Sequence, residues 1–171
     1  DIKIERLTGD NLNNQIWDSF YQFYLNTVDK KWGGAYLTKH FFYLINEKMR
    51  DKILLVVAKQ NNIIIAAALN FIGQNTLFGR NWGTLVDIPF LHFELCYYQA
   101  IEFAIEHNIK KVEAGAQGHH KIQRGYIATS TYSSHYIGNE SFSSAIKNFV
   151  KMEEKEENKQ IEIINTQGTP Y

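Results

Sequence analysis

The spacing of apolar residues along the N-terminal part of the chain predicts a strand followed by two helices. In Asp1–Leu7 apolar and polar residues alternate, which is typical of a half-buried strand. In Leu12–Val28 apolar residues recur every three or four positions, the spacing of an amphipathic helix. Thr38 can cap a second helix, whose apolar positions lie within Phe41–Met49.

The next three apolar runs predict an antiparallel meander. Ile53–Lys59 and Ile63–Asn70 are rich in Ile, Val, Leu and Ala, and Gln60–Asn62 separates them as a hairpin turn. Gly73–Asn75 is a second turn signal, before a short strand at Thr76–Phe78. Because turns this short join antiparallel strands, we expect three neighbouring strands of alternating direction.

The strongest helical pattern of the chain lies between Pro89 and Asn108, and a strand at Lys111–Ala114 follows it. The predicted apolar stripe of this helix comprises Leu91, Leu95, Tyr98, Ile101, Ala104 and Ile105. A strand, a helix and a strand of these lengths favour a right-handed crossover with parallel pairing. We expect Gly79–Gly83 to be a glycine-bounded loop that ends the strand before the helix.

The C-terminal part predicts one extended segment and one helix. Tyr126–Ile137 is rich in Thr, Ser and Tyr and is expected to be a strand or hairpin arm. Ser141 can cap a last helix, for which the charged run Met152–Lys159 is the solvated end. This element order predicts an α/β (α+β) fold of acetyltransferase type, with a mixed sheet and one domain over residues 1–171. Since the chain begins at Asp1 and not at Met, we expect it to be part of a longer chain.

The composition fits a packed domain without a general electrostatic preference. Hydrophobic residues make up 44% of the chain, and 18 Lys and Arg balance 18 Asp and Glu. A net charge of zero gives no general attraction to nucleic acid or to a membrane surface, although a local basic patch stays open. The lone Cys96 excludes an intrachain disulfide and fits a reducing compartment, so we expect a cytoplasmic protein. No apolar run reaches the ~20 residues of a membrane helix, so no membrane partner is expected.

The candidate chemical groups are concentrated between Leu77 and Tyr126, and the first of them lie in Gly79–Gly83. The residues Gly79 and Gly83 permit backbone conformations that other residues resist. Arg80 can bind a carboxylate or phosphate with two hydrogen bonds, and Trp82 offers a flat apolar face. The alternative is a structural role, with Trp82 in the core and Arg80 in an ion pair.

Three further residues are candidates for acid–base catalysis. His92 and Glu94 lie in the first turn of the predicted helix, where a carboxylate in a cleft can take the proton of an attacking amine. Glu113 lies inside a short strand, and an unpaired charge is costly to bury there. It is therefore expected to pair with Arg80 or Arg124, or to take part in catalysis. The alternative for the helical pair is a capping and dipole role.

Polar residues also follow the last predicted strand, where ligands of open α/β sheets gather. Gln117, His120, Lys121 and Arg124 are candidates for binding an anionic donor or acceptor, and a solvated basic loop is the alternative. No pair of His four residues apart and no Cys pair fixes a metal geometry, so no metal site is expected. Cys96 is expected to be a buried, inert thiol.

Several long motifs of the chain resemble one family. The stretches GRNWG, LHFELCYYQAIEFAIEHNI and EAGAQGHHKIQRGY, with DKKWGGAYLT, IIIAAALN and TQGTPY, resemble the FemAB-like group of bacterial proteins in the Gcn5-related N-acetyltransferase superfamily. The resemblance extends over roughly 28–171. The chain departs from the family at His119, where relatives carry an acidic residue in the motif GEHK. The glycine-rich signature for the coenzyme A pyrophosphate is also missing, since Gly79–Gly83 has different spacing.

The resemblance implies an acyltransferase that moves an acyl or aminoacyl group directly to an amine. Glu94 or Glu113 would take the amine proton, and Arg80, Lys121 and Arg124 would hold negative groups of the donor or acceptor. No cofactor is expected to stay bound, and acyl-CoA or aminoacyl-tRNA is a possible cosubstrate, although tRNA would require a basic patch that is not evident. The acceptor is expected to be a small-molecule or peptide amine, and a homo-oligomer stays open. The alternative is a non-catalytic metabolite-binding module.

Overall fold

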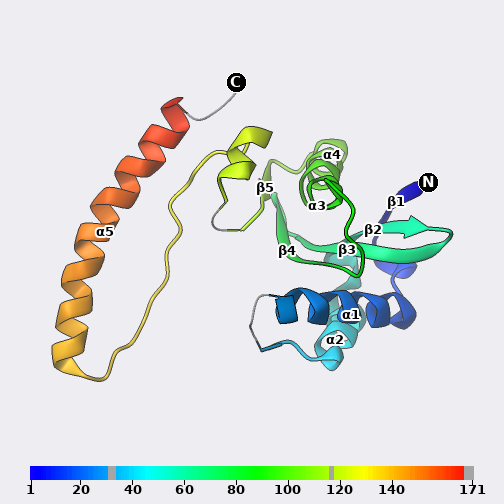
Figure 1. Cartoon of the computed structure of the whole chain (residues 1–171), viewed down its shortest axis with the longest axis horizontal. Helices are drawn as coiled ribbons and strands as arrows, with labels where there is room; N and C mark the ends of the chain where they lie inside the picture. The colour runs from blue at the N-terminus through cyan, green and yellow to red at the C-terminus, as the bar shows by residue number, and fades with distance from the viewer. Residues whose placement is uncertain (31–33, 116–117, 168–171) are drawn as a thin grey trace. The chain divides into compact units, whose positions relative to one another are not determined.

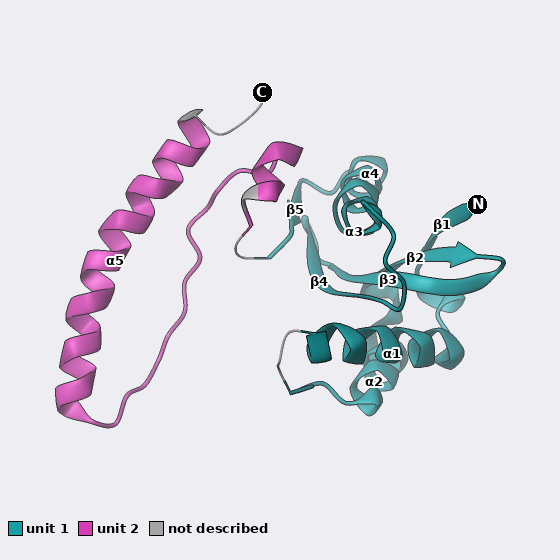
Figure 2. Cartoon of the chain, in the orientation of Figure 1, with its two compact units in different colours: residues 1–115 teal, residues 116–171 magenta. Residues whose placement is uncertain are grey.

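The computed structural model describes residues 1–30, 34–115 and 118–167 (Figure 1). The chain divides into two compact units, residues 1–115 and 116–171 (Figure 2). The first unit contains β1 Ile2–Leu7, α1 Asn14–Lys30, α2 Lys39–Met49, β2 Ile53–Gln60, β3 Ile63–Ile72, β4 Thr76–Thr84, a helix over residues 91–106 and β5 Lys111–Glu113. The short 3-10 turns η1 Gly9–Asn11 and η2 Arg50–Lys52 precede α1 and β2.

The first unit has one mixed sheet of five strands in the order β1-β2-β3-β4-β5. The first four strands are antiparallel, and β5 is parallel to β4. Asn61 and Asn62 join β2 to β3 with φ angles of 51° and 64°, as a type I′ hairpin turn requires. The structure therefore confirms the predicted mixed α/β fold and its order of elements.

Helices cover both faces of this sheet. On one face, Trp17, Phe20 and Phe42 of α1 and α2 are buried against alternate residues of β2 and β3. On the other face, the helix over residues 91–106 covers the remaining residues of these strands. A strand that is buried on both faces reads as a continuous apolar run, which is why β2 shows no alternation.

The helix over residues 91–106 contains one turn of π-helix. It consists of α3 Leu91–Phe93, the π turn η3 Glu94–Tyr98 and α4 Gln99–Glu106. The π turn adds a residue to one turn and so shifts the buried stripe by one position. The side chains buried on this helix are Leu91, Leu95, Tyr97, Ala100, Phe103 and Ala104. The predicted core positions Tyr98 and Ile105 are wrong, since 44% and 71% of their surfaces are exposed.

The second unit contains the 3-10 helix η4 His119–Arg124 and the long helix α5 Glu140–Gln167. The strand predicted at Tyr126–Ile137 does not form, because this described segment pairs with no strand. Instead, the side chain of Asn165 exchanges two hydrogen bonds of 2.8 Å with the backbone of Ala128. The start of α5 is also different from the prediction, since the side chain of Asn139, and not Ser141, accepts the N–H of Phe142 at 2.9 Å.

Replacing Gly83 by alanine should destabilise the first unit. A Cβ at Gly83 would lie 2.4 Å from the carbonyl carbon of Phe23, so α1 would have to move away from β4. Overpacking of this kind costs about 1–3 kcal/mol, which urea unfolding measures. Gly34→Ala is the matched control, because nothing lies within 4 Å of its Cβ position. Equal unfolding midpoints for the two variants would contradict the close crossing of α1 over β4.

Candidate functional site

The strand β4 continues through the residues that were expected to form a loop. Gly79–Gly83 lies inside β4 and pairs with β3, so the predicted glycine-bounded loop is wrong. Leu69 pairs with Asn81 and the next residue, Asn70, pairs with Gly79, which leaves Arg80 as an extra residue. This is a β-bulge, and bulges bend a strand and redirect its side chains.

One edge of β4 loses its partner strand at the bulge. β5 pairs with β4 from Thr76 only as far as Phe78, opposite Glu113. From Gly79 to Thr84, the side of β4 that faces away from β3 has no partner strand among the residues that the structure describes, and at its end the carbonyl of Thr84 accepts the side-chain amide of Asn26 at 2.6 Å. Backbone N–H and C=O groups on such an edge can bind an extended ligand. A Cβ at Gly79 would lie 3.2 Å from the Glu113 carbonyl oxygen, so a glycine suits the point where the strands separate.

Two asparagines flank the bulge, and sequence reasoning did not identify either as a site residue. Asn70 is 1% exposed, and its amide nitrogen donates to the carbonyls of Leu54 and Ala68 at 3.4 Å. Its Oδ1 lies 3.5 Å from the Cβ position of Gly79. The Oδ1 of Asn81 is buried without a hydrogen-bond partner among the described residues. The available signal was Asn70 itself, a polar residue in an otherwise apolar strand.

A pocket of about 290 Å³ lies beside the end of β4. Trp82 pairs with Ala68 of β3 and therefore belongs to the face that the helix over residues 91–106 covers. The residues that line the pocket are Trp82, Thr84, Val86, Asp87, Ile88, Pro89, Phe90, Leu91, His92 and Phe93. The ring centroids of Trp82 and His92 are 5.3 Å apart in an edge-to-face arrangement. The structure thus brings two of the predicted site residues together.

Two amides of the first turn of this helix donate to the loop before it. The N–H of Leu91 donates to the Ile88 carbonyl at 3.3 Å. The N–H groups of Phe93 and Glu94 donate to the Phe90 carbonyl at 2.9 and 3.1 Å. Free amides at a helix start are what binds a phosphate, and here those of Leu91 and Phe93 are already occupied, while the Glu94 bond is the first regular bond of the helix. The residues between Gly83 and the helix also include no glycine and carry one acidic side chain, Asp87.

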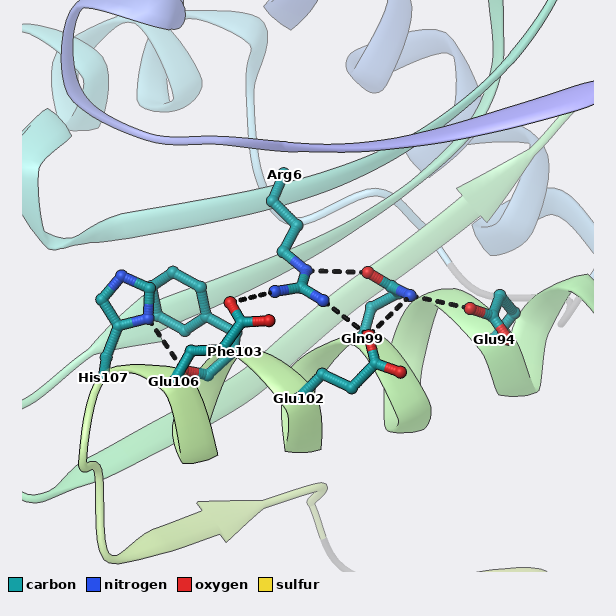
Figure 3. A network of polar contacts seen from close by, with 7 residues as sticks. All are labelled: Arg6, Glu94, Gln99, Glu102, Phe103, Glu106 and His107. Carbon is teal, nitrogen blue, oxygen red and sulfur yellow. Dashed lines mark hydrogen bonds and ion pairs between the residues drawn. The ribbon is translucent and has the colours of Figure 1, made fainter.

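Glu94 takes part in a polar network that is separate from the pocket (Figure 3). Its Oε1 accepts a hydrogen bond of 2.8 Å from Gln99, five residues later, across the π turn. Gln99 in turn accepts the Nε–H of Arg6 on β1 at 2.8 Å. The same guanidinium forms ion pairs of 2.6 Å with Glu102 and Glu106. The structure therefore turns Glu94 toward β1 while His92 contacts Trp82 on β4.

The ion pair expected between Glu113 and Arg80 does not form. Glu113 is exposed at the end of β5, Arg80 is exposed at the bulge, and neither forms a salt bridge in the described part of the chain. Glu113 thus lies beside the point where β4 loses its partner, with its carboxylate open to solvent.

The remaining predicted residues belong to the second unit. His120, Lys121 and Arg124 lie in η4, and Gln117 falls outside the described residues. Arg124 donates to the carbonyl of His120, and burial lowers the pKa of Lys121. That these residues share a site with those of the first unit stays a prediction.

The described residues, 1–30, 34–115 and 118–167, contain neither a group of metal ligands nor a membrane-spanning helix. In these ranges no three His, Cys, Asp or Glu side chains are grouped so that they could hold a metal ion. No helix in the same ranges has the length and apolar character needed to cross a bilayer. Cys96 is half-buried as a residue, and burial of its thiol raises the pKa to about 12.

Comparisons with known proteins agree with the observed fold. The whole chain, residues 1–171, matches the model of the FemAB_like family, described as peptidoglycan biosynthesis/recognition. Curated protein sequences give no significant match.

Solved structures of acetyltransferases are similar to this chain at low sequence identity. A predicted acetyltransferase with acetyl-CoA from Clostridium acetobutylicum has a TM-score of 0.60 and 14% identity, covering 80% of this chain and 96% of its own. An aminoglycoside acetyltransferase from an uncultured soil metagenomic sample, in complex with trehalose, has a TM-score of 0.55 and 12% identity with the same coverage. A ribosomal-protein-alanine N-acetyltransferase from Brucella melitensis has a TM-score of 0.52 and 10% identity, covering 81% of this chain and 99% of its own. At these identities the likeness shows the fold alone.

The backbone conformation of Phe90 predicts that a glycine at this position is more stable than an alanine. Phe90 has a φ angle of 67° in the left-handed region, and 78% of its surface is exposed. Phe90→Gly and Phe90→Ala both remove the ring, but alanine keeps the left-handed strain of roughly 1–2 kcal/mol and glycine does not. We therefore expect the glycine variant to have the higher free energy of unfolding, measured with urea. An alanine variant of equal or greater stability would refute the strained backbone.

The Cys96 thiol should react slowly in the native protein. Because burial raises its pKa to about 12, only a small fraction is thiolate at mildly alkaline pH. We expect labelling by iodoacetamide to be at least about hundredfold slower than in the urea-unfolded protein, whose thiol has an ordinary pKa of about 8.5. Mass spectrometry of timed samples measures both rates. Similar rates before and after unfolding would show that the thiol is not shielded.

Proposed function

Because the chain belongs to the FemAB_like family of peptidoglycan biosynthesis/recognition proteins, we propose that it transfers an acyl or aminoacyl group to an amine. The observation that carries this proposal is the bulge at Arg80, after which one edge of β4 has no partner strand in the described residues. The free edge can bind the reacting carbonyl and its chain through backbone hydrogen bonds. Transfer then depends mainly on holding the two substrates side by side.

In the proposed reaction, the amine nitrogen attacks the carbonyl carbon of the donor ester or thioester. A C–N bond forms, and the carbonyl oxygen becomes an oxyanion that accepts hydrogen bonds from β4 amides. The oxyanion then collapses and expels the oxygen or sulfur leaving group, which takes up a proton. The carboxylate of Glu113, at the end of β5, accepts the proton that the attacking amine loses, directly or through water.

The other predicted residues receive roles that follow from their positions. Arg80 is exposed at the bulge and is suited to bind a negatively charged group of the donor or acceptor. Trp82 and His92 form a wall of the pocket beside the free edge. Glu94 is a weaker candidate for the base, because its carboxylate is hydrogen-bonded to Gln99 in the network around Arg6.

The donor is best described as an activated acyl ester or thioester. One similar structure contains acetyl-CoA, which supports acyl-CoA as a general class of donor for this fold. The residues before the helix of this chain do not fit the pyrophosphate of coenzyme A, since the first-turn amides of Leu91 and Phe93 are already bonded and the loop lacks glycine. No step of the proposed reaction therefore relies on a pyrophosphate at that helix start.

The acceptor is proposed to be an amine on a peptide or sugar of the peptidoglycan type. The family description supports this choice. Similar structures were solved with trehalose and with sisomicin, so the fold can present small polar molecules to its site. A non-catalytic binding module of the same fold is the alternative, and it predicts binding without turnover.

Glu113→Gln should lower kcat by about 10²–10⁴-fold, because the amide cannot take the amine proton. Glu94→Gln is the matched control and should retain most of the activity, since a glutamine oxygen can still accept the hydrogen bond from Gln99. The kcat of each variant is measured by mass spectrometry of acyl transfer to peptide amines, with thioester and aminoacyl-ester donors. Full turnover in Glu113→Gln would refute its role as the base. Binding of donors and acceptors without transfer by the unsubstituted protein would favour the binding module.

A further inference from the structure

The pocket beside β4 has a chemistry that a phosphate-binding site would not have. Its wall is a connected series of rings, in which Trp82 contacts His92, His92 contacts Phe93, and Phe93 lies 6.4 Å from Phe90 between ring centroids. With His92 counted as neutral, the carboxylate of Asp87 is the only charged side chain among the described residues that line it. Aromatic faces and a carboxylate attract a cation and disfavour an anion.

The backbone of the same pocket is also unsuited to an anion. Phosphates bind at helix starts through unpaired amides. Here two of the first-turn amides, those of Leu91 and Phe93, donate to the carbonyls of Ile88 and Phe90 at 3.3 and 2.9 Å. A phosphate would have to break these bonds and approach Asp87 at the same time. The charge of Asp87 and the bonded amides therefore disfavour the same class of ligand on independent grounds.

Phe90 suggests that the rim of the pocket is built for a ligand. It is a large apolar residue with 78% of its surface exposed, so core packing does not explain it. It is also held at a φ angle of 67°, a conformation that costs energy for a bulky residue. Such strain is concentrated at binding sites, where the surrounding structure maintains it.

We propose that this pocket binds an organic ammonium group, a positively charged amine on an aromatic or aliphatic skeleton, and rejects phosphates. The ammonium lies against the faces of Trp82 and Phe90 and near the carboxylate of Asp87, and the skeleton occupies the apolar interior. The volume of about 290 Å³ accommodates one ring with a short amine arm. The assignment of this ammonium to a substrate of the transferase rests on the proposed function, while the binding preference itself does not.

The test compares probes of similar shape and different charge. Phenethylamine, 2-phenylethanol and phenylacetate are cationic, neutral and anionic, and ligand-observed NMR titration measures the Kd of each, with coenzyme A as competitor. We expect phenethylamine to bind about two- to fivefold more tightly than 2-phenylethanol. Phenylacetate should bind most weakly, and coenzyme A should not displace phenethylamine.

Variants assign the binding to this pocket. Asp87→Asn should remove most of the preference for phenethylamine without weakening the binding of 2-phenylethanol. Asp51 is an exposed acid outside the pocket, so Asp51→Asn should leave the Kd of phenethylamine and that of 2-phenylethanol unchanged. Trp82→Leu should weaken all three probes, and circular dichroism checks that it remains folded. Equal binding of phenethylamine and phenylacetate, displacement by coenzyme A, or no binding of any probe would overturn the proposal. No acyl donor is present, so these outcomes are independent of whether Glu113→Gln loses turnover.

Discussion

The structure of the first unit depends on how β4 pairs with two different neighbours. It is antiparallel to β3 along its whole length and parallel to β5 over only three residues. The bulge at Arg80 lies where the second pairing stops. Because a bulge bends its strand, it allows β4 to leave β5 while it keeps its bonds to β3. The free edge, the exposed Arg80 and the carboxylate of Glu113 all follow from this one arrangement.

The helix over residues 91–106 contacts β4 at one end and β1, the strand at the other edge of the sheet, through its later turns. Its first turn places His92 against Trp82 of β4, and its π turn directs Glu94 and Gln99 toward Arg6 of β1. The guanidinium of Arg6 also holds Glu102 and Glu106, so the helix is fixed over the sheet by hydrogen bonds as well as by apolar burial. These contacts hold the ring wall of the pocket in place.

Sequence patterns predicted the elements of the first unit well, because its helices and the hairpin of β2 and β3 have strong local signals. They failed at Gly79–Gly83, where glycine, arginine and asparagine are typical of a loop. There the glycines permit close approach, of α1 at Gly83 and of the β5 backbone at Gly79, and both depend on contacts distant in sequence. The π turn was missed for a related reason, since a single inserted residue changes the buried face without changing the composition.

The sequence indicated which residue types could belong to a site, but it did not indicate which of these side chains contact one another. Trp82 and His92 do meet, whereas Glu94 is drawn toward Arg6, which lies far away in the sequence. Nothing in the local pattern indicated that Asn70 and Asn81 flank a bulge, because the register of β3 and β4 decides it. The second unit was predicted least well, since Tyr126–Ile137 has the composition of a strand but pairs with none in the described residues.

Residue-resolved hydrogen–deuterium exchange by NMR tests most directly whether the outward-facing amides of β4 from Gly79 to Thr84 lack a partner strand. In the ligand-free protein, β4 amides that point toward β3 should be strongly protected, and those beyond Phe78 that point away from β3 should exchange quickly. Strong protection of all amides from Gly79 to Thr84 would contradict the free edge, because another segment would then occupy the edge where the acyl group is proposed to bind.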